Sequence, residues 1–426
     1  MRSIGLAAWS APALLVAFSA VGVDGLNAIF TTSVRWGVLA SALLIVLSHG
    51  LPRSLYSSAF MMASLAFCGW AITSSIWSEW TTITILKSMA FVAVVIGATG
   101  AGYLWVRRNA IPAALDALGP LLVIALIAAI KGRGPSSYSW IGESTQLYQG
   151  GTDNPNFLGA LSAMAVPLPT WKVMSSTSAP RRIGWALCLV ALVVVIGISR
   201  SRAALMIVAF IGGGAAAGIG WRRSIPFAVP AAAVLMVVAL LMPRSMERVT
   251  DEVLYKGSRE YGGVLASRQQ TWGESYDAAL QGGAWGVGYG VSLGSEMVLT
   301  SMTSAVHLGR EKGNSQLGIV EELGLFGLIL YLAGTLALFG LLQRAGRASL
   351  DTRGAALVKL LLGTLAGMTA HSIFEAWYNA PGSMECVYYW VMAGMAVGVA
   401  TDARLRVSGS ASDGPRWSFL AGGRPA

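Results

Sequence analysis

The segment Ser267-Arg268-Gln269-Gln270-Thr271-Trp272 lies in the only long polar stretch of this chain, which extends from Pro243 to Gln316. The same stretch contains Gly286-Val287-Gly288-Tyr289-Gly290 and closes with Lys312-Gly313-Asn314-Ser315 before the next apolar run. On both sides of it the sequence is one apolar run after another. We therefore expect this stretch to lie on one side of a membrane and to carry much of the chemistry of the protein.

The composition is that of a membrane protein. Of the 426 residues, 55% are hydrophobic and only 12% are charged, and the mean hydropathy is +0.62, whereas soluble domains carry about 25% charged residues. The net charge of +10 comes from basic residues in alternate loops and does not indicate a nucleic-acid partner. The cysteines and histidines are dispersed and no Asp-x-Asp pair is present, so we expect no disulfide framework, no metal and no cofactor.

Apolar runs of about 20 residues are long enough to cross a bilayer as helices. The chain contains twelve such runs, and we predict an all-α integral membrane protein with about twelve transmembrane helices and one large exoplasmic loop. The first run follows Arg2 and is longer than the apolar part of most signal peptides, so we predict a retained span rather than a cleaved signal. The predicted spans are residues 6–23, 34–51, 55–77, 84–106, 111–130, 156–173, 183–199, 203–220, 225–242, 317–342, 355–374 and 384–401.

The chain divides into four parts on this basis. Residues 1–242 form an N-terminal bundle of about nine spans, and residues 243–316 form the large exoplasmic loop. Residues 317–401 supply the C-terminal transmembrane helices. Residues 402–426, rich in Gly, Ser, Pro and Arg, are predicted to be a disordered cytoplasmic tail.

The distribution of basic residues predicts the orientation, because loops that stay in the cytoplasm are enriched in Lys and Arg. A cytoplasmic N-terminus places sixteen of the thirty basic residues inside, and both termini are then cytoplasmic. Six basic residues in short loops or flanks remain on the translocated side against this bias, and such exceptions are candidates for function. They are Arg35, Lys87, Lys131, Arg133, Arg200 and Arg202.

Two polar segments could form the walls of a site on the translocated side. Arg200 and Arg202 lie in a tight turn between two spans, where they could bind an anion at the membrane surface or simply extend toward lipid phosphates. The loop of residues 131–155 ends in a polar run, after which Asn156 is predicted to cap the next span and to approach the substrate.

A short amphipathic helix is predicted inside the large loop. Ser267 and Gln270 have the spacing of a capping box, and Gly282-Gly283 supplies a stop signal. We predict that this helix lies along the membrane surface with one face formed by Trp272, Tyr276, Ala279 and Leu280. Arg268 falls in its first turn, where it could bind a phosphate bidentately or pair with Glu274 or Asp277 to hold the loop.

Four ionisable side chains are candidates for the general base of a transfer reaction. His307 and Glu311 precede the tenth span, close to Asn314, which is a candidate substrate ligand. His371 and Glu375 are four residues apart and are predicted to share a helical face at the end of the eleventh span, as catalytic groups or as a structural pair. Glu321 and Glu322, in the first turns of the tenth span, are explained equally well by the helix dipole.

Taken in order, several of these segments resemble the O-antigen ligase and Wzy-type polysaccharide polymerase superfamily. The resemblance covers residues 80–400, and no single motif in it is specific. It rests on Asn154-Pro155-Asn156-Phe157-Leu158-Gly159, Ser199-Arg200-Ser201-Arg202-Ala203, the stretch from Arg268 to the Gly-x-Gly-x-Gly at Gly290, Asn314-Ser315 through Glu322-Leu323-Gly324, and His371-Ser372-Ile373-Phe374-Glu375-Ala376-Trp377 with Gly382-Ser383.

The resemblance implies a metal-independent glycosyltransferase with a GT-C-like fold in the bacterial inner membrane. Its substrate would be a glycan on undecaprenyl diphosphate, with Arg202 and Arg268 binding the diphosphate, and its partners would be membrane lipid, chain-length regulators and flippase proteins. Ligases of this family usually carry a histidine immediately before Asn314, where this chain has Gly313. That difference favours a polymerase of a surface or secreted polysaccharide over the alternatives, an O-antigen ligase or a protein O-oligosaccharyltransferase.

A function of another class is a lipid-linked glycan flippase or transporter. Transporters place their polar residues near the middle of the membrane in interrupted helices, often in two repeated halves. This sequence has no internal repeat and concentrates its polar residues in loops, so we rank the flippase lower.

Overall fold

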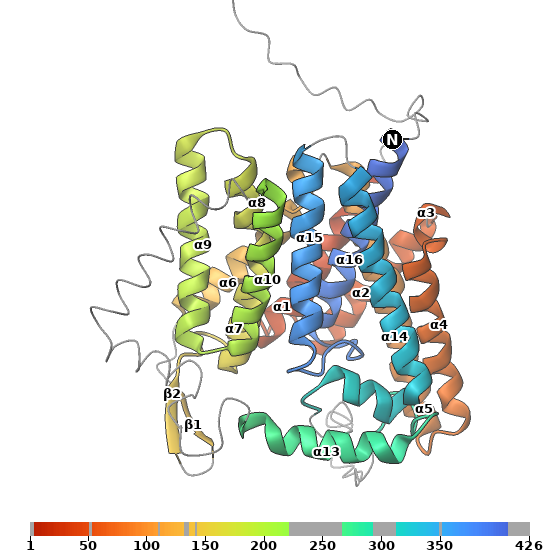
Figure 1. Cartoon of the computed structure of the whole chain (residues 1–426). Helices are drawn as coiled ribbons and strands as arrows, with labels where there is room; N and C mark the ends of the chain where they lie inside the picture. Colours follow the sequence, from red (N-terminus) through yellow and green to blue (C-terminus); the bar gives the residue numbers. More distant parts are fainter. Residues whose placement is uncertain are drawn as a thin grey trace, which may run out of the picture.

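The computed structural model describes residues 4–50, 53–109, 111–131, 136–140, 143–220, 266–292, 312–348 and 352–407. These residues form a helical bundle crossed at one end by a single helix (Figure 1). The helices of the bundle are α1 (Ile4–Ser19), α2 (Thr32–Ser48), α3 (Arg53–Tyr56), α4 (Ala59–Thr73), α5 (Thr81–Arg108), α6 (Gly119–Ile130), α7 (Pro155–Ala165), α8 (Pro167–Ser175), α9 (Ala179–Ser199), α10 (Arg202–Ile219), α14 (Ser315–Ala348), α15 (Thr352–His371) and α16 (Met384–Val407), and α13 (Ala266–Gly282) lies across the end.

Eight helices in the described part of the chain are long and apolar enough to cross a membrane, which confirms a multi-pass helical membrane protein. They coincide with eight of the predicted spans. Three more predicted spans, residues 6–23, 34–51 and 111–130, coincide with apolar helices of 10–17 residues, and the run at 225–242 lies outside the described residues. The total of twelve spans stays a prediction. The eight helices are Ala59–Ile76, Thr81–Arg108, Pro155–Ser175, Ala179–Ser199, Arg202–Ile219, Ser315–Ala348, Thr352–His371 and Met384–Asp402.

One element of the structure was not predicted. Strands β1 (Ser136–Trp140) and β2 (Glu143–Leu147) form an antiparallel hairpin, with Ser136 opposite Leu147 and Trp140 opposite Glu143. The hairpin follows α6 and precedes α7, within the segment that the sequence indicated only as a polar loop. Each strand has only five residues and most of them are polar, so the sequence carries a weak strand signal. The other elements of the described chain are helices.

The centre of the bundle is formed by α5 and α16, whose facing residues are almost all buried. The two helices approach closely because glycines face backbone across their interface. A Cβ at Gly102 would overlap the carbonyl of Val391, and one at Gly394 would overlap the carbonyl of Thr99. Small residues drive helix association in membranes by allowing this approach.

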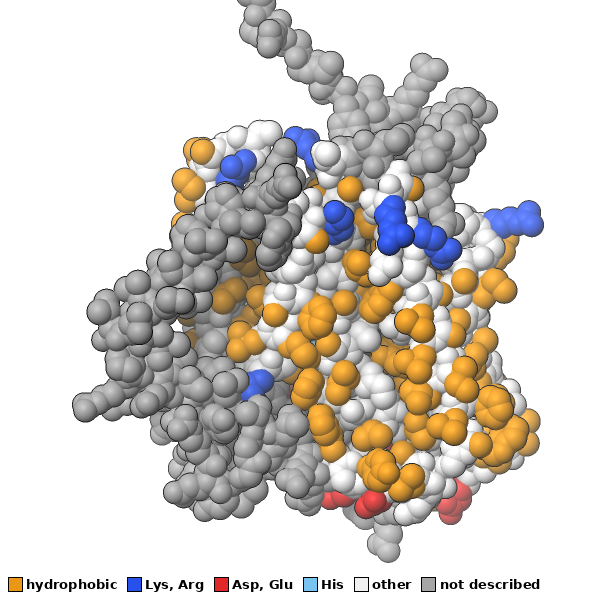
Figure 2. Space-filling model, in the orientation of Figure 1, with side chains coloured by type: hydrophobic (Ala, Val, Ile, Leu, Met, Phe, Trp, Pro, Cys, Tyr) orange, Lys and Arg blue, Asp and Glu red, His pale blue; other side chains and the backbone are white. Residues whose placement is uncertain are grey.

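The two ends of the bundle differ in charge (Figure 2). Lys and Arg gather at the end where α5 and α14 finish, and acidic side chains are visible at the end where α13 lies (Figure 1). The described basic residues at the opposite end include Arg53, Arg107, Arg108, Lys172, Arg181, Arg182, Arg344, Arg347 and Arg353.

Candidate functional site

Helix α13 closes the end of the bundle, and its existence confirms the helix predicted in the large loop. Ser267 lies in its first turn rather than before it, and the helix ends at Gly282, followed by Gly283 with φ of +61°. The indole Nε1 of Trp272 donates to the carbonyl oxygen of Gly313 at 3.0 Å, and its ring lies 5.6 Å from that of Phe374. The middle of α13 is thus docked on the segments that precede α14 and follow α15.

The predicted apolar face of α13 contains both buried and exposed residues. Ala279 and the polar Ser275 are buried and Trp272 is partly buried, but Tyr276 and Leu280 are 55% and 64% exposed. The reason is the close approach of Gly282 to α14, where a Cβ would lie 2.8 Å from the carbonyl oxygen of Glu321. Small residues therefore face the protein, and the larger apolar ones face outward.

Helix α14 is interrupted at Gly324, whose backbone angles of φ +67° and ψ −167° are not helical. Only glycine readily adopts such angles. The interruption frees carbonyl oxygens from intrahelical bonding, and three of them accept other donors. The carbonyl of Glu321 accepts from Val287 N at 2.9 Å, that of Glu322 from Gly288 N at 2.9 Å, and that of Leu323 from Trp70 Nε1 at 2.9 Å.

The glycine-rich segment of residues 283–290 is inserted against this interruption. A Cβ at Gly286 would overlap the backbone of Glu322, and Gly286, Gly288 and Gly290 all have positive φ. Tyr289 is completely buried between them, with its N–H donating to Ser74 Oγ at 3.0 Å and its hydroxyl donating to the carbonyl of Asn379 at 2.6 Å. Burial, with the nearby Glu322 as a second cause, raises the pKa of the Tyr289 phenol well above its usual value, so it stays protonated.

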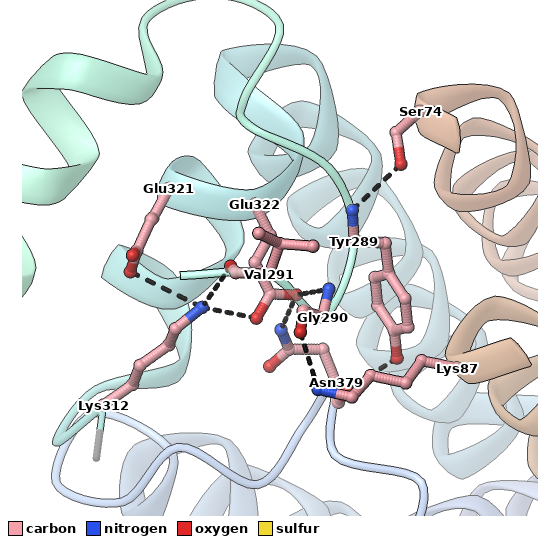
Figure 3. Close-up of polar contacts among 9 residues, drawn as sticks. All are labelled: Ser74, Lys87, Tyr289, Gly290, Val291, Lys312, Glu321, Glu322 and Asn379. Atoms are coloured by element: carbon pink, nitrogen blue, oxygen red, sulfur yellow. Dashed lines mark hydrogen bonds and ion pairs between the residues drawn. The ribbon is translucent and has the colours of Figure 1, made fainter. Parts of the chain in front are cut away.

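A buried charged network surrounds the same segment (Figure 3). Lys312 Nζ lies 2.5 Å from Glu322 Oε1 and 3.5 Å from Glu321 Oε2, and it donates to the carbonyl of Val291 at 3.2 Å. Glu322 Oε2 accepts from Gly290 N at 2.9 Å and from Asn379 Nδ2 at 2.8 Å. The side chains of Lys312 and Glu322 are only 10% and 6% exposed.

Lys87 completes this network from α5 by donating to the carbonyl of Gly290 at 2.6 Å. The network therefore joins α5, the glycine-rich segment, the start of α14 and the turn that carries Asn379. The ammonium group of Lys312 has three protons and three acceptors in this network, namely Glu322 Oε1, Glu321 Oε2 and the carbonyl of Val291. We therefore assign Lys312 a structural role rather than substrate binding.

Only indirect signs of this network are present in the sequence. Lys87 was noted as a basic residue on the translocated side, and Glu321 and Glu322 were explained by the helix dipole. The contact between Glu322 and Asn379 joins segments 57 residues apart, which no local pattern reveals.

A second polar region is built around the turn between α9 and α10, which has the predicted tight form. Arg200 ends α9 with φ of +52°, and Arg202 begins α10. A Cβ at Gly159 would overlap Ser201 and would lie 3.0 Å from Ser199 Oγ, so α7 packs directly on this turn. Two motifs that are forty residues apart, at Gly159 and at Ser199, are thereby brought into contact.

The predicted cap of α7 is wrong by two residues. Asn154, not Asn156, is the N-cap, because its Oδ1 accepts from the N–H of Asn156 at 2.7 Å while Pro155 occupies the first helical position. Asn156 lies in the first turn and is partly buried, so its side chain has no capping role. Its predicted contact with substrate stays a prediction.

Asn314 has a structural role at the start of α14. Its Oδ1 accepts from the N–H of Leu317 at 2.9 Å, as an N-cap does, and its side chain is largely buried. The preceding Gly313 packs under α13, where a Cβ would lie 2.9 Å from Thr271 Cγ2. This packing explains why a larger residue does not fit at position 313 in the present arrangement.

His371 and Glu375 do not share a helical face, because α15 ends at His371. The chain then turns, held by Ser315, whose Oγ donates to the carbonyl of Glu375 at 3.0 Å and accepts from the N–H of Trp377 at 3.1 Å. Trp377 Nε1 donates to His371 Nδ1 at 2.8 Å. Because an indole only donates, this bond keeps Nδ1 unprotonated and makes His371 a poor general base.

The remaining predicted site residues lie partly or wholly outside the described residues. His307 and Glu311 are outside them, and of Arg268 only the backbone position in the first turn of α13 is described. Within the described part of the chain no group of three potential metal ligands occurs. Glu375 is partly buried in the turn that carries Phe374, beside α13.

Two comparisons with known proteins identify no relative of this chain. The chain matches no protein-family model and no curated protein. The family resemblance stays a prediction from the sequence.

Proposed function

We propose that this protein is a metal-independent membrane glycosyltransferase that polymerises a bacterial surface or secreted polysaccharide. It would transfer a glycan from undecaprenyl diphosphate to a hydroxyl of another lipid-linked repeat unit. Protein and lipid A acceptors, as used by oligosaccharyltransferases and ligases, are the alternatives within the same chemistry.

The observation that carries this proposal is the meeting of distant motifs at one end of the bundle. Gly159 packs against the Ser199–Arg202 turn, and α13, which carries Arg268, docks on the segments around Gly313 and Phe374 at that same end. On this proposal, Arg200 and Arg202 of the turn and Arg268 of α13 would bind one diphosphate at the membrane surface. Guanidinium groups suit this task because they match phosphate geometry bidentately.

The proposed reaction needs two contributions from the protein. Arg200, Arg202 and Arg268 would stabilise the negative charge on the departing undecaprenyl diphosphate as the bond from the anomeric carbon to the phosphate oxygen breaks. A general base would take the proton of the acceptor hydroxyl as its oxygen forms the new glycosidic bond. Of the described candidates we propose Glu375, because the Nδ1 of His371 is occupied by Trp377.

The charge difference between the two ends supports the orientation predicted for the chain. The basic residues at the α5 and α14 C-terminal ends correspond to the loops predicted to be cytoplasmic. The α13 end would then face the periplasm or the outside. A reporter fused after Gly283 is expected to be exoplasmic and one after Gly346 cytoplasmic; the reverse result would exclude the proposed mechanism.

The interruption of α14 is one observation that favours the flippase alternative, since transporters use interrupted helices to bind ions. Here, however, the freed carbonyls of Glu321, Glu322 and Leu323 are used by Val287, Gly288 and Trp70. The first part of α14 also lies toward the α13 end rather than midway along the bundle (Figure 1). These contacts favour a structural interruption over an ion site.

The decisive experiment compares Arg268→Ala with Arg181→Ala, a matched change at the opposite end. Purified protein in liposomes would receive lipid-linked repeat units, and polymer length would be measured. We expect Arg268→Ala to lower the rate by about 10²–10³-fold, the usual cost of losing an electrostatic group that stabilises the transition state, with Arg181→Ala unchanged. Glu375→Gln should also lower it.

Normal polymerisation by Arg268→Ala at an equal protein level would refute the diphosphate role. In cells that lack the protein, lipid-linked single repeat units should accumulate on the outer leaflet. Their retention on the inner leaflet would instead support the flippase.

A further inference from the structure

An exposed aromatic surface lies where α4, the glycine-rich segment and α14 meet. Its central ring, Trp70, has the rings of Trp77, Trp285 and Phe326 at 5.3, 5.6 and 5.5 Å, and Trp285 lies 5.2 Å from Phe326. Trp285 is 56% exposed, and Trp77 and Phe326 are also exposed. We call these four residues the aromatic surface.

The aromatic surface is tied to the backbone of the glycine-rich segment and of α14. Trp77 Nε1 donates to the carbonyl of Gly286 at 3.1 Å, and Trp70 Nε1 donates to the carbonyl of Leu323, just before the interruption at Gly324. These two indoles point their polar atoms inward and leave their apolar rings toward the outside. The rings are therefore bonded to the glycine-rich segment, which carries Tyr289, and to α14 just before its interruption.

The residues around the aromatic surface indicate that its partner is lipid. Exposed apolar residues continue from it along the outward faces of α14 and α4, and Figure 2 shows hydrophobic side chains covering this side of the molecule down to the α13 end. Both helices are long and apolar enough to cross a membrane. The continuing residues are Leu325, Ile329, Leu332 and Leu336 on α14, and Met62, Leu65, Ile72 and Ile76 on α4 and the turn after it.

We propose that the aromatic surface, together with the outward face of α13 formed by Tyr276 and Leu280, is inserted into the lipid leaflet at the α13 end. An apolar surface that continues a lipid-facing one is covered by the same lipid, and Trp and Tyr are enriched where acyl chains meet headgroups. A contiguous apolar patch of this kind is rarely left in water. The inference does not depend on the catalytic activity proposed above.

The insertion has a structural consequence for the α13 end. The leaflet holds the outer side of the glycine-rich segment through Trp77 and Trp285, while the buried network of Lys312 and Glu322 holds its inner side. The C-terminal end of α13 is thereby fixed at the depth of the headgroups. A substrate with a diphosphate headgroup would meet α13 at that depth.

The test places single fluorescent labels on cysteines introduced by Leu280→Cys and Trp285→Cys. Cys188→Ala removes the one native cysteine that is not buried, because Cys68 and Cys386 are inaccessible. The labelled protein is reconstituted in vesicles with lipids brominated in the upper acyl chain. Ile329→Cys on the lipid-facing side of α14 and Glu274→Cys on the polar side of α13 are the matched controls.

We expect brominated lipid to reduce the fluorescence at positions 280 and 285 as strongly as at position 329, and to leave position 274 unaffected. Quenching of positions 280 and 285 by aqueous iodide instead would overturn the proposal, because the surface would then face water. Protection from both quenchers would also overturn it, since a second protein copy or a bound glycan would be the occupant.

Discussion

The contact between Lys312 and Glu322 allows a sharp test of how the α13 end is held together. Lys312→Met keeps most of the length of the side chain and removes its charge. Glu322 and Glu321 would then be two buried carboxylates without the ammonium group that lies 2.5 and 3.5 Å from them. The hydrogen bonds from Gly290 and Asn379 would remain, but they do not neutralise the charge.

The expected cost follows from the burial of the pair. Removing one partner of a buried ion pair costs about 3–5 kcal/mol, because the other charge stays desolvated. The side chains of Lys312 and Glu322 are 10% and 6% exposed, so solvent screening is small. Lys87 is part of the same network and compensates in part, so we expect about 3 kcal/mol, the lower end of that range.

Hydrogen exchange of the glycine-rich segment is the appropriate measurement, since it reports local opening free energies. The amides of Val287, Gly288 and Gly290 donate to Glu321 O, Glu322 O and Glu322 Oε2 and should be protected in the wild type. In Lys312→Met, a cost of about 3 kcal/mol corresponds to an increase of about 10²-fold in their exchange rates.

The chain supplies a matched control for this change. Lys172 and Asp116 form an ion pair with the same 2.5 Å separation, but their side chains are 22% and 41% exposed. Lys172→Met should cost no more than about 1 kcal/mol and should not alter exchange at the glycine-rich segment. The two ion pairs differ in burial but not in the distance between the lysine Nζ and the carboxylate oxygen.

A double variant separates charge compensation from packing. Lys312→Met with Glu322→Gln removes both charges, and we expect it to be more protected than Lys312→Met alone, with a coupling energy above about 0.5 kcal/mol. Unchanged exchange in Lys312→Met, or additive effects in the double variant, would show that the charge pair does not hold the segment.

Two further changes test the interruption of α14 and the packing under α13. Gly324→Ala should lower the unfolding temperature, because alanine at φ of +67° is strained and its Cβ would overlap the carbonyl of Ala284. Gly340→Ala, in the regular part of α14, is the control and should be neutral or slightly stabilising. Equal effects of the two changes on thermal melts would contradict this interpretation. Gly313→His introduces the histidine common in ligases, and it should push α13 away from position 313, where Thr271 of α13 packs. We expect it to reduce polymerisation rather than create transfer to a new acceptor, as polymer length and lipid A modification in the same cells would reveal.

Much of the fold could be predicted because transmembrane helices are encoded locally. Each of the eight long apolar helices coincides with a run of apolar residues, and Gly282-Gly283 marks the end of α13. The wrong cap of α7 could have been avoided with rules already available. Proline is favoured at the first helical position, so Pro155 by itself indicates Asn154 as the cap.

The errors at the site have a different origin, namely contacts between distant segments. Helical spacing paired His371 with Glu375, but the bonds from Ser315 end α15 and turn the chain between them. Helical spacing also groups Tyr276 with Trp272, and it is the approach of Gly282 to α14 that leaves Trp272 partly buried and Tyr276 exposed. In both cases a partner elsewhere in the chain decides the outcome, and a periodic pattern contains no information about it.

The buried network also changes how the charge distribution of the chain should be interpreted. Lys87 is one of the basic residues on the translocated side that run against the predicted bias, and Lys312 is a further basic residue in the large exoplasmic loop. In the folded protein Lys312 is neutralised by Glu321 and Glu322, and Lys87 bonds to Gly290 in the same network. A lysine that is compensated inside the protein contributes little to the field at the membrane surface. Arg200 and Arg202, at the turn between α9 and α10, are the basic residues of the α13 end that the proposed diphosphate site requires.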